Sequence, residues 1–339
     1  MSTILIDKNV QVPNPRKITT KPRRSDQIFR SIMTFGGLTA FIVLAIIALY
    51  LFTRSTPVLR EFGWHFVSGS IWNSGDGFPA SKGSENPAQF GLFPMLYGSF
   101  LIAVIAMFIA VPISVSIAIG IVFYLPKRIS NIVTFFVDLS ASIPSVIFGL
   151  WGLFVLSPHA AYWAKLLKKY LHAIPIFSVD FPSFDQSPFV AGLVLALMIT
   201  PIVTSVSREI FSQTPIELVQ GAYSLGANKS SMIRMVAIPF GRGGIIGGAM
   251  LGLGRALGET IAVFYVLQLV YDKTNFFQIL ESKGGSVASL IVARYGEASE
   301  FEISALFGAG LVLFLLTLAA NFVAAGIVTR TLRSNKKKK

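Results

Sequence analysis

Long apolar runs separated by short polar segments dominate the chain. A helix needs about 20 apolar residues to cross the ~30 Å hydrocarbon core of a bilayer, and we predict six such helices. The second run contains Pro112 but no polar turn, so we expect one long kinked helix there. The pattern therefore predicts an all-α, polytopic membrane protein with spans at residues 32–52, 92–125, 132–156, 189–206, 243–270 and 303–328.

The cations between these runs predict the orientation of the chain. With a cytoplasmic N-terminus, the inside segments hold 19 Lys and Arg residues and the outside segments hold 9. Positive charge favours the cytoplasmic side. We therefore expect both termini in the cytoplasm of a cell-membrane protein, with Lys165, Lys168 and Lys169 as a cluster on the opposite side.

The predicted organisation is a first helix and a core, flanked by two tails. The tails, 1–31 and 329–339, are basic, and we expect them to lie against anionic membrane lipid. The first transmembrane helix is 32–52. The core of five helices covers 92–328 and includes a cytoplasmic loop at 208–240.

Composition supports this class and excludes others. The chain is 53% hydrophobic and 13% charged, whereas soluble proteins carry roughly 25% charged residues. The cations lie between apolar runs, so we expect no nucleic-acid partner. Without cysteine the chain has no disulfide or thiol chemistry, and its three histidines lack metal-ligand spacing. We therefore expect no metal or cofactor on this chain, and no catalytic residue.

The cytoplasmic loop between the fourth and fifth spans predicts two short amphipathic helices. Thr214 is the expected N-cap of the first, with Pro215 at its first position and Glu217 completing a capping box. Gly226 is its expected stop, and Asn228 is expected to cap a second helix that ends at Pro239. Such a pair can lie on lipid or fill a groove on a soluble partner.

Three ionisable residues lie within the predicted spans, namely Asp138, Arg255 and Glu259. Charge within hydrocarbon is costly, so each is expected to face the bundle interior or a water-filled cavity. Arg255 and Glu259 are four residues apart and, in a continuous helix, would lie on one face. Two interpretations stay open: an ion pair that joins two helices, or an Arg255 guanidinium that presents a planar fork to a passing oxyanion.

Glycines on the fifth span predict close helix packing. Gly244, Gly248 and Gly252 form one row at four-residue spacing, and Gly254 and Gly258 form another. Small residues in such rows let helix backbones approach each other. The run 252–260, which reads G-L-G-R-A-L-G-E-T, does not match a nucleotide-binding fingerprint. We therefore expect ATP to be hydrolysed by another chain.

The cytoplasmic loop resembles the coupling loop of ABC-importer permeases, whose pattern is E-A-A, three residues, G, nine residues, I-x-L-P. The matching positions are Gln220, Gly221 and Ala222, then Gly226, then residues 236–239 ending in Pro239. Ala222, Gly226 and Pro239 match outright. Gln220 replaces the acid, so a salt bridge from that position is not expected.

The run 252–260 also resembles oxyanion permeases, in which R-A-x-G-E recurs. Its ending, with Thr260 directly after Glu259, is most similar to the C-type subunit of phosphate-specific permeases. Residues 142–145, 149–152 and 211–215 add to the likeness, which runs from about residue 26 to residue 331. We assign to the translocation pathway Arg255, Glu259, Thr260, Asp138 and Ser142.

The resemblance implies a MetI-like fold with a cytoplasmic coupling helix and the function of a phosphate importer subunit. It also implies partners: a second, A-type permease, two ATP-binding subunits and an extracytoplasmic phosphate-binding protein. Three alternatives remain, namely a permease for sulfate or molybdate, an ATP-independent secondary transporter or channel, and a membrane-embedded hydrolase. A secondary transporter often shows internal repeats, and this chain shows none.

Overall fold

The computed structural model describes residues 24–179, 184–271, 278–281 and 285–336, with side chains as far as 323 and at 325 and 326. The basic segment 1–23 and residues 337–339 lie outside the described residues. The chain divides into two parts, Met1–Leu49 and Tyr50–Lys339. The first part contributes the N-terminal portion of an apolar helix, which begins at Arg24, eight residues before the predicted span.

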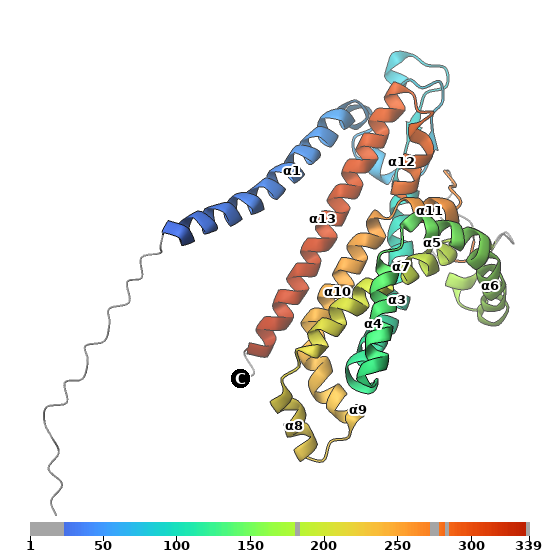
Figure 1. Cartoon of the computed structure of the whole chain (residues 1–339). Helices are drawn as coiled ribbons and strands as arrows, with labels where there is room; N and C mark the ends of the chain where they lie inside the picture. The colour runs from blue at the N-terminus through green and yellow to red at the C-terminus, as the bar shows by residue number, and fades with distance from the viewer. Residues whose placement is uncertain (1–23, 180–183, 272–277, 282–284, 337–339) are drawn as a thin grey trace, which may run out of the picture. The chain divides into compact units, whose positions relative to one another are not determined.

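The described secondary structure is almost entirely helical (Figure 1). The α-helices are α1 (Arg24–Phe62), α2 (His65–Ser68), α3 (Phe93–Ile119), α4 (Lys127–Ala141), α5 (Ser145–Trp151), α6 (Ser157–Leu171), α7 (Pro188–Ser212), α8 (Ile216–Ser224), α9 (Lys229–Met232), α10 (Ile238–Gly258), α11 (Ile261–Val266), α12 (Val287–Tyr295) and α13 (Glu300–Lys336). Short 3-10 turns are η1 (Ala80–Lys82) and η4 (Pro175–Phe177), and π turns are η2 (Gly120–Tyr124), η3 (Gly152–Leu156) and η5 (Ile233–Ala237). Strands β1 (Trp72–Asn73) and β2 (Gln89–Phe90) pair antiparallel.

Six helices in the described residues are long and apolar enough to cross a membrane, which confirms the predicted number. They are Arg24–Phe62, Phe93–Tyr124, Ser145–Leu171, Pro188–Ser212, Lys229–Gly258 and Glu300–Val323. The second is one helix with Pro112 inside it, as expected. The third differs from the predicted span at 132–156. It runs from Ser145 to Leu171, so it continues through α6 into the segment that was expected to be an external loop.

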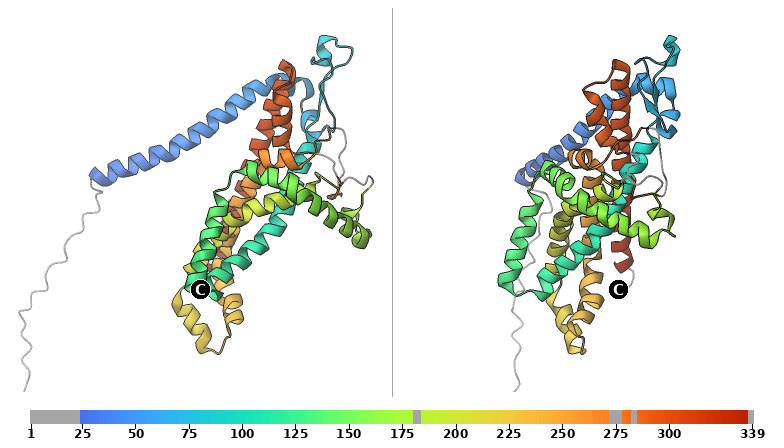
Figure 2. Two further views of the ribbon diagram at one scale, coloured as in Figure 1. Left: turned by 45° about the vertical axis from the view of Figure 1, so that its right-hand side comes forward. Right: turned by 90° about the vertical axis from the view of Figure 1, so that its right-hand side faces the viewer.

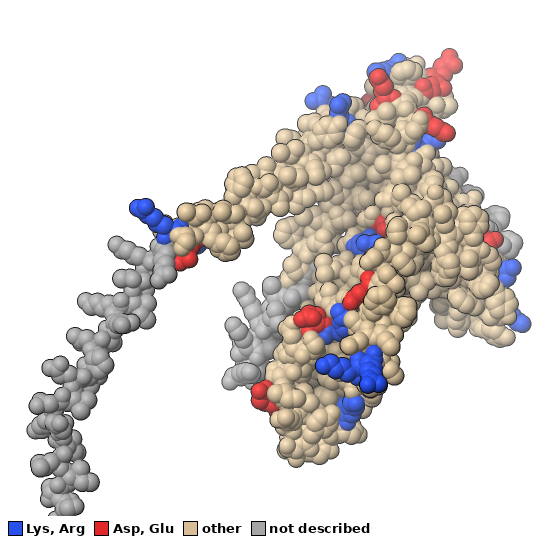
Figure 3. Space-filling model, viewed as in Figure 1, with Lys and Arg blue, Asp and Glu red and all other residues tan. Residues whose placement is uncertain are grey.

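Helices α3, α7 and α10 pack against one another at the centre of the second part, and α13 packs against α10 (Figure 2). Their shared core is built from small and β-branched residues, among them Ala106, Val194 and Ile199. A separate apolar cluster joins β1 and β2 to α12 and the start of α13. On the face shown in Figure 3, charged side chains gather at the two ends of this part and are few between them.

The glycine row on α10 packs against α7, as the spacing predicted. A Cβ atom at Gly244 would collide with Ile210, and one at Gly248 would lie 3.2 Å from the Val206 Cβ. A Cβ at Gly252 would lie 3.0 Å from the Val203 Cγ2. The second row does not serve this purpose, because a Cβ at Gly258 would meet nothing within 4 Å.

Candidate functional site

Two of the predicted spans are interrupted, and the interruptions define the candidate site. The prediction of one helix over 132–156 is wrong, because α4 ends at Ala141 and α5 begins at Ser145. Pro144 lacks an N–H group and disfavours helical backbone in the residue before it, which accounts for this break. The prediction of one helix over 243–270 is also wrong, because Glu259 adopts an extended backbone with φ −72° and ψ 124°.

The short helices that follow the two breaks pack directly on each other. A Cβ at Gly149 of α5 would lie 2.9 Å from the Ala262 Cα of α11, so the two backbones nearly touch. Non-helical backbone at membrane depth is tolerated where protein buries it or where it lines a watery cavity. Discontinuous helices of this kind form binding sites in many transporters. Ser142 lies at the first break and Glu259 at the second, just before the two short helices that pack on each other.

Arg255 and Glu259 do not pair, contrary to the ion-pair expectation. The helix ends between them, so they no longer share a face. Glu259 is buried, and its Oε1 accepts a hydrogen bond from the Ala262 backbone N at 3.3 Å. Arg255 is exposed, and within the described residues it makes no ion pair or hydrogen bond with a side chain. Thr260 donates its hydroxyl to the Gly258 carbonyl at 3.3 Å.

Asp138 lies on α4 and is bound to α7. Its Oδ2 is 3.5 Å from the Arg208 Nη1, and its Oδ1 accepts a hydrogen bond from the Ser205 Oγ at 2.7 Å. Arg208 falls within the cytoplasmic loop predicted at 208–240, but the structure places it on the last turns of a spanning helix. Asp138 thus joins two helices, whereas Ser142 is exposed at the first break.

The cytoplasmic loop forms a tight turn between α8 and α9. Gly226 has φ +80°, a left-handed conformation that favours glycine. The Gly226 N–H donates to the Tyr223 carbonyl and the Ala227 N–H to the Ala222 carbonyl, which together make a Schellman motif. The predicted glycine stop is therefore confirmed, and Asn228 caps α9 by accepting from the Ser231 N–H at 2.8 Å.

Two other predictions for this loop are wrong. Thr214 does not cap α8, because its hydroxyl donates to the Phe211 carbonyl at 2.8 Å and leaves Pro215 at the N-cap position. Pro239 does not end the second helix, because Lys229–Gly258 is one continuous helix. The π turn at Ile233–Ala237 precedes the proline and shifts the hydrogen-bond register, which accommodates its missing N–H.

A groove of about 590 Å³ lies between α8 and the start of the long helix. Gly221 and Ala222 line it, and Leu225 at its edge is 91% exposed. Gln220 is exposed on the adjacent surface of α8. An exposed leucine beside an open apolar groove is typical of a protein-binding surface. The loop therefore has an open apolar groove with an exposed leucine at its edge.

One polar cluster was missed by the sequence analysis. Glu302 at the start of α13 is 1% exposed and accepts from Arg294 Nε at 2.8 Å and Arg294 Nη2 at 3.1 Å. It also accepts from the Trp72 Nε1 at 3.1 Å and the Ser74 Oγ at 2.8 Å. The hydrogen bond from Arg294 to Glu302 raises the pKa of the guanidinium. Trp72 lies 230 residues before Glu302 in the sequence, so the cluster gives no local signal.

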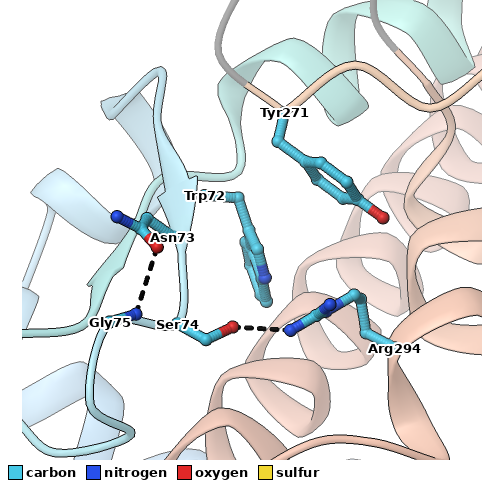
Figure 4. A pocket seen from close by; sticks show the side chains of 6 residues that line it. All are labelled: Trp72, Asn73, Ser74, Gly75, Tyr271 and Arg294. Atoms are coloured by element: carbon cyan, nitrogen blue, oxygen red, sulfur yellow. Dashed lines mark hydrogen bonds between the residues drawn. The ribbon is translucent and has the colours of Figure 1, made fainter.

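Around this cluster is a small polar pocket of about 300 Å³, shown in Figure 4. In this view the Trp72 ring lies beside the Tyr271 and Arg294 side chains, and burial raises the pKa of the tyrosine hydroxyl. The cluster ties the segment that carries β1 to helices α12 and α13. In the described part of the chain, no group of three or more His, Asp or Glu side chains comes close enough to hold a metal ion.

The chain is similar to known membrane transport proteins over most of its length. Residues 110–333 match the family described as "Binding-protein-dependent transport system inner membrane component". The chain is 36% identical over 308 residues to "Phosphate transport system permease protein PstC 2" of Mycobacterium tuberculosis, covering 90% of this chain and 92% of that protein. It is 34% identical over 338 residues to the PstC permease of Xylella fastidiosa, covering 98% and 99%.

A solved structure shares the fold at low sequence identity. A bacterial alginate ABC transporter in complex with an alginate-bound periplasmic protein matches with a TM-score of 0.55 at 13% identity, covering 91% of this chain and 98% of that one. The family match covers about two thirds of the residues, and the two relatives cover nearly the whole chain. The chain belongs to the family of binding-protein-dependent transport system inner membrane components.

Proposed function

We propose that this chain is one of two membrane-spanning permease subunits of an ATP-driven importer of inorganic phosphate. The relatives that match nearly its whole length are named phosphate transport permeases. The observation that carries the proposal is Arg255, an exposed cation on an apolar span with no side-chain partner in the described residues. An unpaired charge in that setting needs water or an anion, and a guanidinium fork fits the oxygens of phosphate.

The remaining site residues have supporting roles in this proposal. Glu259 fixes the start of α11 and so places the backbone that follows Arg255. Thr260 and Ser142 bring hydroxyl groups to the two breaks, and Asp138 holds α4 to α7. The pathway would form where this chain meets a second permease of the same family. No cofactor is assigned to this chain.

Energy would enter through the loop that contains Gly226. Two ATP-binding subunits would dock at the groove between α8 and the long helix, on the cytoplasmic side. A phosphate-binding protein would deliver substrate on the opposite side, where β1, β2 and α12 lie. This arrangement puts both termini in the cytoplasm, as the cation distribution favours.

Phosphate uptake by variants of Arg255 tests the proposal. We expect Arg255→Gln to abolish uptake and Arg255→Lys to restore only part of it, because an ammonium keeps the charge but loses the planar fork. Arg242→Gln is the matched control, since Arg242 is an exposed cation on the same helix, and it should transport normally. Each rate is corrected for the amount of protein in the membrane.

Two outcomes would count against this function. If Arg255→Gln combined with Glu259→Gln transports at a near-normal rate, Arg255 serves only to neutralise an acid. If an excess of sulfate or molybdate blocks the uptake of labelled phosphate, the substrate is another oxyanion. We expect the double variant to stay inactive and neither anion to compete.

A further inference from the structure

Helix α6 carries a surface that the proposed function leaves unused. Its lysines, Lys165, Lys168 and Lys169, lie on the side of the membrane that the orientation assigns to the outside, where cations are sparse. Figure 3 shows blue side chains on the outer edge of this helix. A cluster of this kind on an apolar helix needs its own explanation.

One face of α6 is anchored to the protein. Ser157, Ala160, Ala161 and Ala164 are buried, and they recur at helical spacing. Ala161 and Ala164 belong to an apolar cluster that also contains Phe184 and Leu280. The helix is therefore fixed in place, and its other faces are free to meet the surroundings.

The opposite face of α6 is aromatic. Tyr162 is 61% exposed, Trp163 is 45% exposed and Tyr170 is 71% exposed. Tyr162 and Tyr170 are eight residues apart with Leu166 between them, so the three form one stripe along the helix. Exposed tyrosine and tryptophan on a membrane protein are typical of the level of the lipid headgroups, where their apolar rings meet acyl chains and their polar atoms meet water.

The lysines border this stripe but do not share one role. Lys168 turns inward, with its Nζ donating to the Val179 carbonyl at 3.3 Å and lying 5.9 Å from the Phe184 ring centre. Lys165 and Lys169 are exposed and four residues apart, so they form one edge of the helix, on which the Lys165 Nζ also lies 5.9 Å from the Phe184 ring centre. Within the described residues their only recorded contacts are with aromatic rings, Phe184 and Tyr170.

We propose that this edge and stripe form a binding surface for anionic phospholipid. The aromatic stripe would contact the acyl chains, while Lys165 and Lys169 would bind the phosphate groups of headgroups such as phosphatidylglycerol. Long lysine side chains reach the headgroup level from apolar positions in this way. Inorganic phosphate could bind the same lysines through its oxygens. It has no apolar part, however, so it would leave the adjoining stripe of exposed aromatic rings without a binding partner.

Quenching of Trp163 by brominated lipid tests the proposal on the complete transporter, reconstituted with its partner subunits. The fluorescence of Trp163 is obtained by subtracting the fluorescence of a complex with Trp163→Phe from that of the unchanged complex. We expect brominated phosphatidylglycerol to quench it more than brominated phosphatidylcholine at equal mole fraction. The preference should be about fivefold for each lysine that binds a headgroup. Lys165→Gln with Lys169→Gln should abolish the preference and leave quenching itself intact.

A matched control removes two other exposed cations from the same side. Arg60→Gln with Lys82→Gln should keep the full preference. With the unchanged chain, about 1 M salt should weaken the preference, because it shortens the screening length to ~3 Å. If neither lipid quenches Trp163, protein covers this face of α6. If both lipids quench it equally, the lysines do not distinguish between charged and neutral headgroups. A preference that millimolar inorganic phosphate removes would assign the lysines to free phosphate. Each of these three results overturns the proposal.

Discussion

The cluster around Glu302 allows a quantitative prediction about what holds the segment with β1 to the last helix. Glu302→Ala removes an acceptor that four donors share: two nitrogens of Arg294, the Trp72 Nε1 and the Ser74 Oγ. Breaking a buried ion pair from one side costs about 3–5 kcal/mol, because the other charge stays unpaired. The Arg294 side chain is 25% exposed, so water replaces part of the loss. We therefore expect a loss of about 3 kcal/mol in the free energy of unfolding.

The assay is a double-mutant cycle measured by unfolding the purified protein in mixed detergent micelles. Arg294→Ala alone leaves Glu302 buried without its cation and should cost a similar amount. The double variant should cost less than the sum of the two by about 2 kcal/mol, since no charge then remains unpaired. Glu300→Ala is the control, because Glu300 lies on the same helical turn but is exposed, and it should stay within about 0.5 kcal/mol of the unchanged protein.

If the stability loss of the double variant equals the sum of the losses of Glu302→Ala and Arg294→Ala, the reasoning is refuted. Such additive losses would mean that Arg294 and Glu302 contribute independently, for example through separate contacts with water. A normal stability for Glu302→Ala would contradict the burial and the four hydrogen bonds directly. A result in which only the segment near Trp72 becomes sensitive to protease would still fit, because the cluster would then hold that segment locally.

Three further predictions concern the loop, the helix pair and the orientation. Gly226→Val should leave the protein in the membrane but uncouple transport from ATP hydrolysis. A Cβ at this position meets nothing within 4 Å, so the cost of about 1 kcal/mol or more comes from the left-handed backbone. Normal ATP-stimulated transport by this variant would contradict the coupling role of the loop. Asp138→Asn should slow uptake but keep the fold, because Ser205 can still donate its hydrogen bond to residue 138. Arg208→Met alone should lose stability, and adding Asp138→Leu should restore it, because no unpaired charge then remains. If the second substitution restores nothing, the ion pair does not contribute to stability. In intact cells an impermeant thiol reagent should label Ser84→Cys but not Ser334→Cys, and the reverse pattern would invert the topology.

The sequence shows which segments are apolar, but it does not show where a helix stops within an apolar run. Hydropathy averages over about 20 residues, so the interruption at Pro144, with serines at 140, 142 and 145, is hidden within a run that is apolar on average. The stop at Gly258 was equally hidden, and the common helical face on which the ion-pair interpretation of Arg255 and Glu259 depended is lost with it. The two breaks differ in cause. Pro144 accounts for the first one locally. The contact between the short helices that follow the breaks, at Gly149 and Ala262, joins residues that are far apart in the chain, so it leaves no local signal.

Local signals in the loop were reliable at two positions and failed at Thr214, whose hydroxyl donates to the end of the preceding helix instead. Gly226 and Asn228 act within a few residues, and both were predicted correctly. The partners of Asp138 and Glu302 depend on how distant segments fold together. The sequence shows that these two residues are acidic, but it does not show which residues bind them. A charged residue in a span predicts that a partner or water exists. Which residue supplies it is decided by tertiary structure.

The error at Pro239 has a mechanical consequence. A helix that ended there would separate the cytoplasmic loop from the fifth span by a flexible joint. The structure instead has one helix of 30 residues, Lys229–Gly258, which is about 45 Å long at 1.5 Å per residue. Its first turn lies beside the groove, and Arg255 is on its last turn. In the proposed importer, a displacement of the docked ATPase would therefore reach the anion site through a single rigid element, with the π turn at Ile233–Ala237 as its one irregular point.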